Sequence, residues 1–173
     1  MSLSMSKASV DTYARTLTAL SAIIDKAAEH AVAKKFDPNL YCTMRLRPDM
    51  FAFARQVQVC CDQAKNASAR LASVEPPKFE DHEATLGDLK ARIEKTLAFV
   101  GGLDRKAIDA SAEREIVFPL GPNKMKMAGA DYLIQFSLPN FFFHVTAAYA
   151  ILRYAGVELA KRDFLGAVQM SPA

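Results

Sequence analysis

The chain has 173 residues, of which 51% are apolar, and its 22 basic and 19 acidic residues give a net charge of +3. This length and composition predict a single domain, residues 1–173, with its own apolar core, and they exclude disordered and fibrous classes. Basic and acidic residues are mixed along the chain, which argues against nucleic-acid binding, and no apolar run approaches the roughly 20 residues that span a membrane.

The first predicted element is a long amphipathic helix. Its apolar residues recur at alternating steps of three and four, which places them on one helix face. They are Val10, Tyr13, Leu17, Leu20, Ile24, Ala27 and Ala31. Ser4 or Ser6 is expected to cap the start of this helix, because a serine hydroxyl accepts a hydrogen bond from a free amide of the first turn.

A second long helix follows the loop 36–48. Its stripe consists of Met50, Phe53, Val57, Cys60, Ala64, Ala67 and Leu71. The helix is predicted to stop before Glu75, because the following Pro76 and Pro77 lack an amide hydrogen and disfavour helical geometry in the preceding residue.

The third helix is predicted to begin at Thr85. Thr85 and Asp88 resemble a capping box with Asp in place of Glu, and Gly101 and Gly102 mark the end of the helix. Its stripe consists of Leu86, Leu89, Ile93, Leu97 and Val100. From Glu113 to Met127 apolar residues alternate with their neighbours on both sides of the turn signal 121–123, which predicts a small β-hairpin.

The last long helix is predicted to run to Gly156. A short helical turn is expected at 132–136, and Ser137 and Pro139 are expected to provide the cap and the early-helix proline. Four long amphipathic helices predict an all-α fold, a four-helix bundle with a long crossover between the third and fourth helices that contains the hairpin.

The cysteine count and the N-terminus both indicate a cytoplasmic protein. Cys42, Cys60 and Cys61 form an odd set, and the adjacent pair cannot easily bridge within a helix, so reduced thiols are expected. The segment 1–7 lacks the apolar region of a signal peptide.

The segment Pro139–Val157 resembles the fourth helix of the DinB-like four-helix proteins, because His144 and the pair Leu152-Arg153 have the spacing of that motif. Together with the segments 45–51, 56–58 and 161–166, nearly the whole chain resembles an uncharacterised bacterial domain-of-unknown-function family in the DinB-like superfamily of metalloenzymes. The similarly named damage-bypass polymerases are unrelated, and an association with stress is a hint at the level of the family alone.

The resemblance also implies a degenerate metal site. Better-understood DinB-like proteins bind a divalent metal such as nickel or zinc through three histidines, one on the second helix and two at i and i+4 on the fourth. Here the resemblance gives His144 at the later fourth-helix position, Asn140 at the earlier one, and Gln56 near the second-helix position. Amides are weak metal ligands, so no metal or other cofactor is expected, with His144 the one ligand if any metal binds. His30 and His82 are not expected to replace the missing ligands.

Two interpretations of His144 follow. It is either a buried core histidine hydrogen-bonded to Asn140, Gln56 or a backbone carbonyl, or it lines a pocket with Gln56 and Asn140 that binds a small polar ligand. Cys60 lies one turn after Gln56 and is either core filler or a thiol nucleophile activated by His144. Tyr41, placed on a loop, is a further candidate for the rim of the pocket.

The run Phe141–Phe143 spans most of the helix circumference, so at least one ring faces away from the bundle, and a homodimer is the expected partner arrangement.

The sequence contains no phosphate-binding loop, paired CxxC motif or GxSxG elbow. Whether the chain is an enzyme stays open. The preferred function is a non-catalytic small-molecule-binding or stress-associated protein that has lost the metal site, and the alternative is a metal- or thiol-dependent hydrolase or transferase that uses His144.

Overall fold

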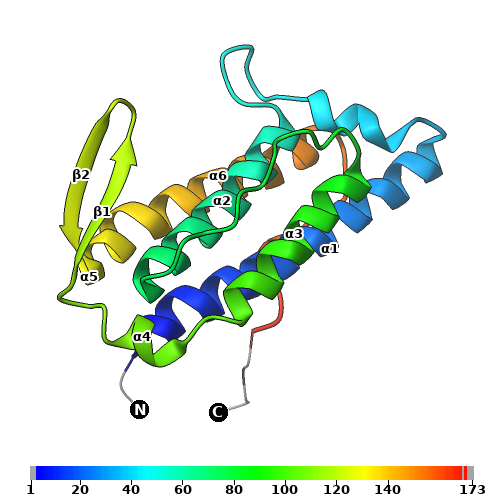
Figure 1. Cartoon of the computed structure of the whole chain (residues 1–173). Helices are drawn as coiled ribbons and strands as arrows, with labels where there is room; N and C mark the ends of the chain where they lie inside the picture. The colour runs from blue at the N-terminus through cyan, green and yellow to red at the C-terminus, as the bar shows by residue number, and fades with distance from the viewer. Residues whose placement is uncertain (1–2, 169, 171–173) are drawn as a thin grey trace.

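The structure is a computed structural model that describes residues 3–168 and 170, and it is mainly helical with one small two-stranded antiparallel sheet. Four long helices lie side by side (Figure 1): α1 (Thr12–Lys34), α2 (Phe53–Ala72), α3 (Leu86–Gly101) and α6 (Leu138–Tyr154). Helix α2 packs against both α6 and α3, and α1 packs against α3. Within the described residues, no helix is both long enough and apolar enough to cross a membrane.

Short elements make the fold more complex than the four helices expected from the sequence. They are the helices α4 (Arg105–Asp109), α5 (Gly129–Asp131) and α7 (Lys161–Leu165), the π-helical segments η1 (Lys7–Asp11) and η3 (Tyr132–Ser137), and the 3₁₀ helix η2 (Pro38–Thr43). Each is too short for its apolar residues to form a repeating stripe, so the sequence pattern gives no signal for most of them.

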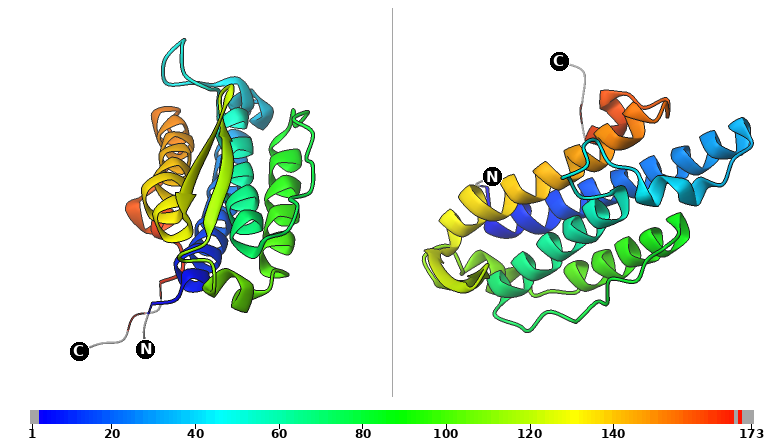
Figure 2. Two further views of the ribbon diagram at one scale, coloured as in Figure 1. Left: turned by 60° about the vertical axis from the view of Figure 1, so that its left-hand side comes forward. Right: turned by 90° about the horizontal axis from the view of Figure 1, so that it is seen from above.

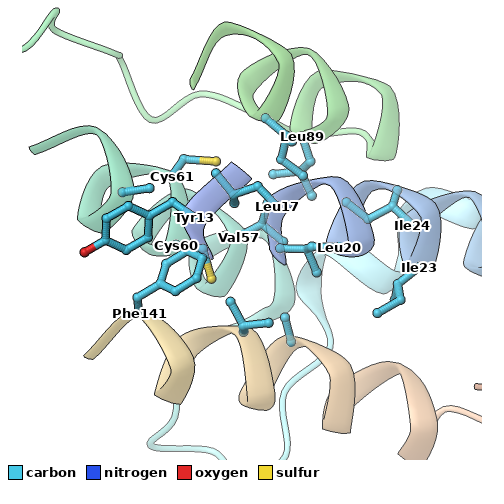
Figure 3. Close-up of a cluster of buried hydrophobic side chains, with 14 of the residues drawn as sticks. Tyr13, Leu17, Leu20, Ile23, Ile24, Val57, Cys60, Cys61, Leu89 and Phe141 are labelled. Carbon is cyan, nitrogen blue, oxygen red and sulfur yellow. The ribbon is translucent and has the colours of Figure 1, made fainter. Parts of the chain in front are cut away.

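The predicted apolar stripes form the core. Every residue of the first stripe is buried, and Ser4 supplies one of the two proposed caps, since its Oγ accepts a hydrogen bond from the amide of Lys7. In Figure 3, Leu17 and Leu20 of α1 face Val57 of α2, and Phe141 of α6 lies beside Tyr13. The two aromatic rings meet edge to face with centroids 4.9 Å apart.

Helix α2 begins later than its stripe predicted. Met50 lies in the preceding loop, and the helix starts at Phe53, whose amide donates to the carbonyl of Met44. The helix ends at Ala72, before Glu75 as predicted, and Ser73 then takes a left-handed conformation with φ of 57°. The predicted capping box of Thr85 and Asp88 at the start of α3 is present.

The predicted hairpin is also present, between α3 and α6. Strands β1 (Glu115–Leu120) and β2 (Asn123–Ala128) pair antiparallel, and Gly121 in the turn has a φ of 58°, which glycine adopts without strain. The hairpin lies over η3 and the N-terminal part of α6 (Figure 2). The Phe118 ring of the hairpin packs there on Tyr132 and Phe136 of η3.

The prediction that Ser137 caps the last helix is wrong. Segment η3 runs directly into α6, so Ser137 has helical dihedral angles and makes no capping hydrogen bond. Because the preceding residues are already helical, no helix start exists there for Ser137 to cap. Its hydroxyl instead hydrogen-bonds the buried Tyr13 hydroxyl at 2.7 Å and so ties α1 to α6. Pro139 lies in the first turn of α6 as expected, and the helix ends at Tyr154, two residues before Gly156.

Candidate functional site

The side chains of His144 and Gln56 meet between α6 and α2. Nδ1 of His144 lies 2.7 Å from Oε1 of Gln56, and Nε2 of Gln56 donates to the carbonyl of Phe51 at 3.2 Å. Gln56 is 1% exposed and lies beneath His144, which is 9% exposed. The buried Gln56 side chain therefore holds the imidazole of His144 in position.

These contacts decide which nitrogen of His144 carries the proton. An amide oxygen can only accept hydrogen bonds, so Nδ1 of His144 is the donor in its contact with Gln56. Nε2 is then an acceptor in the neutral ring. It has no hydrogen-bond partner among the described residues, and it is not one of their fully buried unpaired atoms, so solvent reaches it.

Three neighbouring side chains shape the surroundings of the imidazole. The Phe51 ring is stacked nearly parallel to His144 with centroids 6.3 Å apart, and the Phe143 ring meets it edge to face at 5.2 Å. The Arg55 guanidinium lies over the Phe51 ring at 5.8 Å from its centroid. Burial, and then the positive charge of Arg55, lower the pKa of His144 below its ordinary value of 6.5. Burial and Arg55 therefore both favour the neutral imidazole.

Acid should destabilise the folded protein through His144. The unfolded chain takes up a proton near pH 6.5, whereas the folded chain resists protonation at this ring, so the free energy of unfolding should decrease as pH falls below about 6.5. Well above pH 6.5 the ring is neutral in both the folded and the unfolded chain, so His144 no longer makes the free energy of unfolding depend on pH. Denaturant unfolding at pH values on both sides of 6.5 measures the effect, and His144→Gln, which does not titrate, is the control. Equal pH dependence in the two proteins would contradict this expectation.

The residues at the three predicted ligand positions do not fit a metal. Asn140 is half-buried one turn before His144 on α6, and the described part of the chain shows no hydrogen bond between the two side chains. The set thus offers one imidazole and two amides, and the Gln56 oxygen is already engaged by His144. Residues 3–168 and 170 contain no group of three histidine, cysteine or acidic side chains that could hold a metal ion.

Cys60 and Cys61 both point into the core. In Figure 3 the Cys61 sulfur is directed toward α3 and the Cys60 sulfur lies near Phe141 of α6. Burial raises the pKa of the Cys60 thiol well above its ordinary value, and burial raises that of Cys61 to about 12 despite a hydrogen bond with Thr96. The inward direction expected for Cys60 is correct, but a thiolate there is strongly disfavoured.

Thiol labelling of the folded protein should therefore be slow. At mildly alkaline pH an unhindered thiol reacts readily with a disulfide reagent, whereas Cys60 and Cys61 are both 0% exposed. Mass spectrometry of the labelled protein identifies the modified cysteines, and the same reaction in denaturant is the control. Modification of Cys60 at the rate of the denatured chain would contradict its assignment as core filler.

Tyr41 has a different environment from the one that its candidate role at the rim of the pocket suggested. It lies on η2, is 1% exposed, and its hydroxyl is 2.6 Å from Nδ1 of His30 on α1. Its ring also packs on Phe36. No sequence pattern indicated this pairing, because only the fold of the intervening turn brings residues 30 and 41 together. Nδ1 of His30 therefore has a hydrogen-bond partner of its own in Tyr41.

An apolar groove lies on the outer side of α6, and its lining includes Phe143, which contacts the imidazole of His144, but not His144 itself. It has a volume of about 410 Å³ and is lined by Leu46, Met50, Phe142, Phe143, Thr146, Ala147 and Ala150. Met50 precedes the Phe51 ring that stacks on His144, and Phe143 contacts the imidazole edge to face. The importance of Phe51 and Arg55 was missed from the sequence, although both lie within five residues of Gln56.

A second polar cluster, also missed from the sequence, lies between α2 and α3. The Arg92 guanidinium, 1% exposed, forms ion pairs with Asp62, Asp81 and Glu83 at 2.9–3.0 Å. The cations of Arg92 and Lys65 both lie over the ring of Phe79. Burial raises the pKa of Glu83, but hydrogen bonds from Arg92, its own backbone and Gln58 outweigh burial and leave the pKa below its ordinary value. The cluster holds the segment 78–84 against the two helices.

Comparison with known proteins extends these observations. The sequence model of DUF1993, a domain of unknown function, matches residues 5–165. Among solved structures, the chain is similar to the crystal structure of a DinB family member protein from Shewanella denitrificans, with 36% sequence identity and a TM-score of 0.91. The match covers 97% of this chain and 95% of that one. Among curated proteins, none matches the chain.

Proposed function

The chain belongs to the DUF1993 family and is a DinB-like protein, and from this premise we propose that it is a non-catalytic small-molecule-binding protein that has lost the three-histidine metal site of the superfamily. In this proposal the chain is a single DinB-like four-helix-bundle domain, with the hairpin in the crossover between its third and fourth long helices. A stress-associated role would be exercised through the same binding site.

The hydrogen bond between His144 and Gln56 is the observation that carries this proposal. It uses the amide oxygen at one former ligand position to fix the imidazole at another, in an arrangement that needs no metal to hold the histidine in place. The imidazole keeps Nε2 as an acceptor with no partner among the described residues, and Phe143, which contacts the ring, also lines an apolar groove. A few polar atoms next to apolar walls are the usual composition of a small-molecule site.

Binding to a panel of small compounds tests this function. The panel contains neutral, anionic and cationic fragments, and the imidazole ¹⁵N signals of His144 report binding by NMR. We expect at least one fragment class to shift these signals saturably, and the shift of neighbouring amides to disappear in His144→Ala. His82→Ala, which removes an exposed loop histidine, is the matched control and should bind normally. The proposal fails if no fragment in the panel affects His144.

The enzymatic alternative finds less support in the chemistry of the site. A thiol-dependent reaction needs an accessible thiolate, whereas Cys60 is fully buried and its pKa is raised by burial. A metal-dependent reaction needs ligands that Gln56 and Asn140 supply poorly. The chemistry that His144 itself offers is that of a general base, through Nε2.

A homodimer through the C-terminal end of α6 is part of the proposal. Tyr154 is 76% exposed and does not line the groove, so a second copy that removes its ring from water would leave the groove and its Phe143 wall open to a ligand. Sedimentation velocity at micromolar concentration should show a dimer, with Tyr154→Ser shifting the protein toward monomer. Val32→Ser, at an exposed position of α1, is the control and should remain dimeric. A monomer in the unsubstituted protein would contradict this arrangement.

A further inference from the structure

A cavity separate from the His144 site lies between α1 and the C-terminal part of the chain. It has a volume of about 790 Å³, and its walls come from η1, the N-terminal half of α1, α7 and residues 166–168. Helix α7 packs against α1, which brings these segments together although they are far apart in the sequence. The volume falls in the range of small-molecule sites.

Two contacts fix the wall that residues 165–168 form. Nη1 of Arg15 donates to the carbonyl of Leu165 at 2.5 Å. Gly166, with a φ of 66°, lies so close to α1 that a Cβ there would be 3.0 Å from the Cβ of Ala19. A ligand that enters a cavity whose walls are already in place has little ordering to bring about when it binds.

The carboxylates that line the cavity already have cationic or amide partners. Asp11 accepts a hydrogen bond from the Arg105 guanidinium at 2.6 Å, and Asp163 pairs with the Lys26 ammonium at 2.7 Å. The other oxygen of Asp163 accepts the amide of Ala160 at 2.7 Å. Both acids therefore attract a cationic ligand only weakly.

The cations that line the cavity have no carboxylate partners. Lys7 and Arg162 form no ion pair within residues 3–168 and 170, and the Arg15 side chain binds only the neutral carbonyl of Leu165. Three positive charges thus line the cavity without an acid to balance them. A guanidinium matches the planar geometry of a carboxylate, so the charges favour an anionic ligand.

The other walls are mostly small and apolar. Ala19 and Ala22 of α1 contribute to them, together with Ala167 and Val168, and none of the described lining residues is aromatic. Such walls pack against a flexible alkyl chain but offer no ring on which an aromatic group or a base could stack. The lining therefore favours an anion with an aliphatic body.

We propose that this cavity is a second ligand site, which binds an aliphatic carboxylate. The carboxylate lies among the cations of Lys7, Arg15 and Arg162, and the alkyl chain packs on the alanine walls. The site shares no residue with that of His144, so it can be tested independently of the proposed function.

Probes that differ in head group or chain test the site on the unsubstituted protein. Decanoate carries the anion, 1-decanol lacks the charge, decylammonium reverses it, and acetate lacks the long chain. Decanoate should bind saturably and shift the amide NMR signals of Ala19, Ala22 and Gly166, while the His144 signals stay in place. Decanol should bind about tenfold more weakly, as expected for the loss of charge-assisted hydrogen bonds, and acetate should not saturate the site.

A pair of arginine variants tests the cations. The Arg162 side chain makes no hydrogen bond or ion pair within the described part of the chain, so Arg162→Gln should fold normally and weaken decanoate about fivefold without affecting decanol. Arg153→Gln removes an exposed arginine of α6 outside the cavity and is the matched control, which should bind decanoate normally. Equal affinity for decanoate and decanol would overturn the proposal, as would equally tight binding of decylammonium, equal losses in the two variants, or decanoate shifts confined to the surroundings of His144.

Discussion

Replacing Gln56 and Asn140 together by histidine should give this chain a three-histidine nickel or zinc site. Gln56 already reaches the His144 ring, and Asn140 lies one helical turn before it, so the two new imidazoles would converge with the existing one. Removing a residue that merely hydrogen-bonds to a metal ligand typically lowers metal affinity by about 10–100-fold. Supplying two direct ligands should therefore increase the affinity by on the order of 100-fold or more.

Isothermal titration with nickel and zinc measures this gain. The control carries the same two substitutions together with His144→Ala, which removes the third imidazole and should bind much more weakly. Circular dichroism establishes that each variant is folded, since Gln56 is a buried position. If the double variant binds metal no better than the unsubstituted chain, the interpretation of residues 56, 140 and 144 as a former metal site is wrong.

Replacing Arg92 by alanine should produce a large loss of stability. The substitution leaves the carboxylates of Asp62, Asp81 and Glu83 without their shared cation in a site where Glu83 is only 10% exposed. Removing one partner of a buried ion pair costs about 3–5 kcal/mol, and the partial exposure of Asp62 and Asp81 places the expected loss near the lower value. Urea denaturation at neutral pH measures the free energy of unfolding.

Arg105→Ala is the matched control for this experiment. Arg105 pairs with Asp11, and both side chains are about half exposed, so its loss should cost at most about 1 kcal/mol. The pKa of Glu83 is lowered in the folded protein, so its contribution is complete above its ordinary pKa of 4.5 and disappears as pH falls through the lowered value. The difference between Arg92→Ala and the unsubstituted protein should shrink accordingly in acid. Equal losses for Arg92 and Arg105 at neutral pH would contradict the structural importance of the buried cluster.

Periodicity and capping signals were sufficient to predict the long elements of this fold. The stripe from Val10 to Ala31 is entirely buried, and the capping box at Thr85 marks the true start of α3. The same reasoning failed at Ser137, because a local cap signal cannot reveal that the preceding segment is already helical. Arg92 lies at helical spacing between the buried Leu89 and Thr96, but a charged residue is assigned to the surface unless its partners on other elements are known.

The pairing of His144 with Gln56 was predictable, whereas the side chains around the pair and their chemistry were not. The resemblance to DinB-like proteins brought Gln56 and His144 together, and the structure gives the hydrogen bond between them. The tautomer of His144, the covering ring of Phe51 and the charge of Arg55 depend on how the loop before α2 folds over α6, which no short motif encodes. The reactivity of Cys60 likewise depends on how completely the thiol is buried. Helical spacing shows only that Cys60 faces the core.

Metal binding by the unsubstituted chain is the most direct test of the claim that the metal site has been replaced by an amide–histidine pair. The protein would be purified without chelator, its metal content measured, and the folded chain then titrated with nickel, zinc and manganese while thermal stability is followed. We expect substoichiometric metal and no saturable stabilisation that depends on His144. Stoichiometric metal that is lost in His144→Ala would contradict the account.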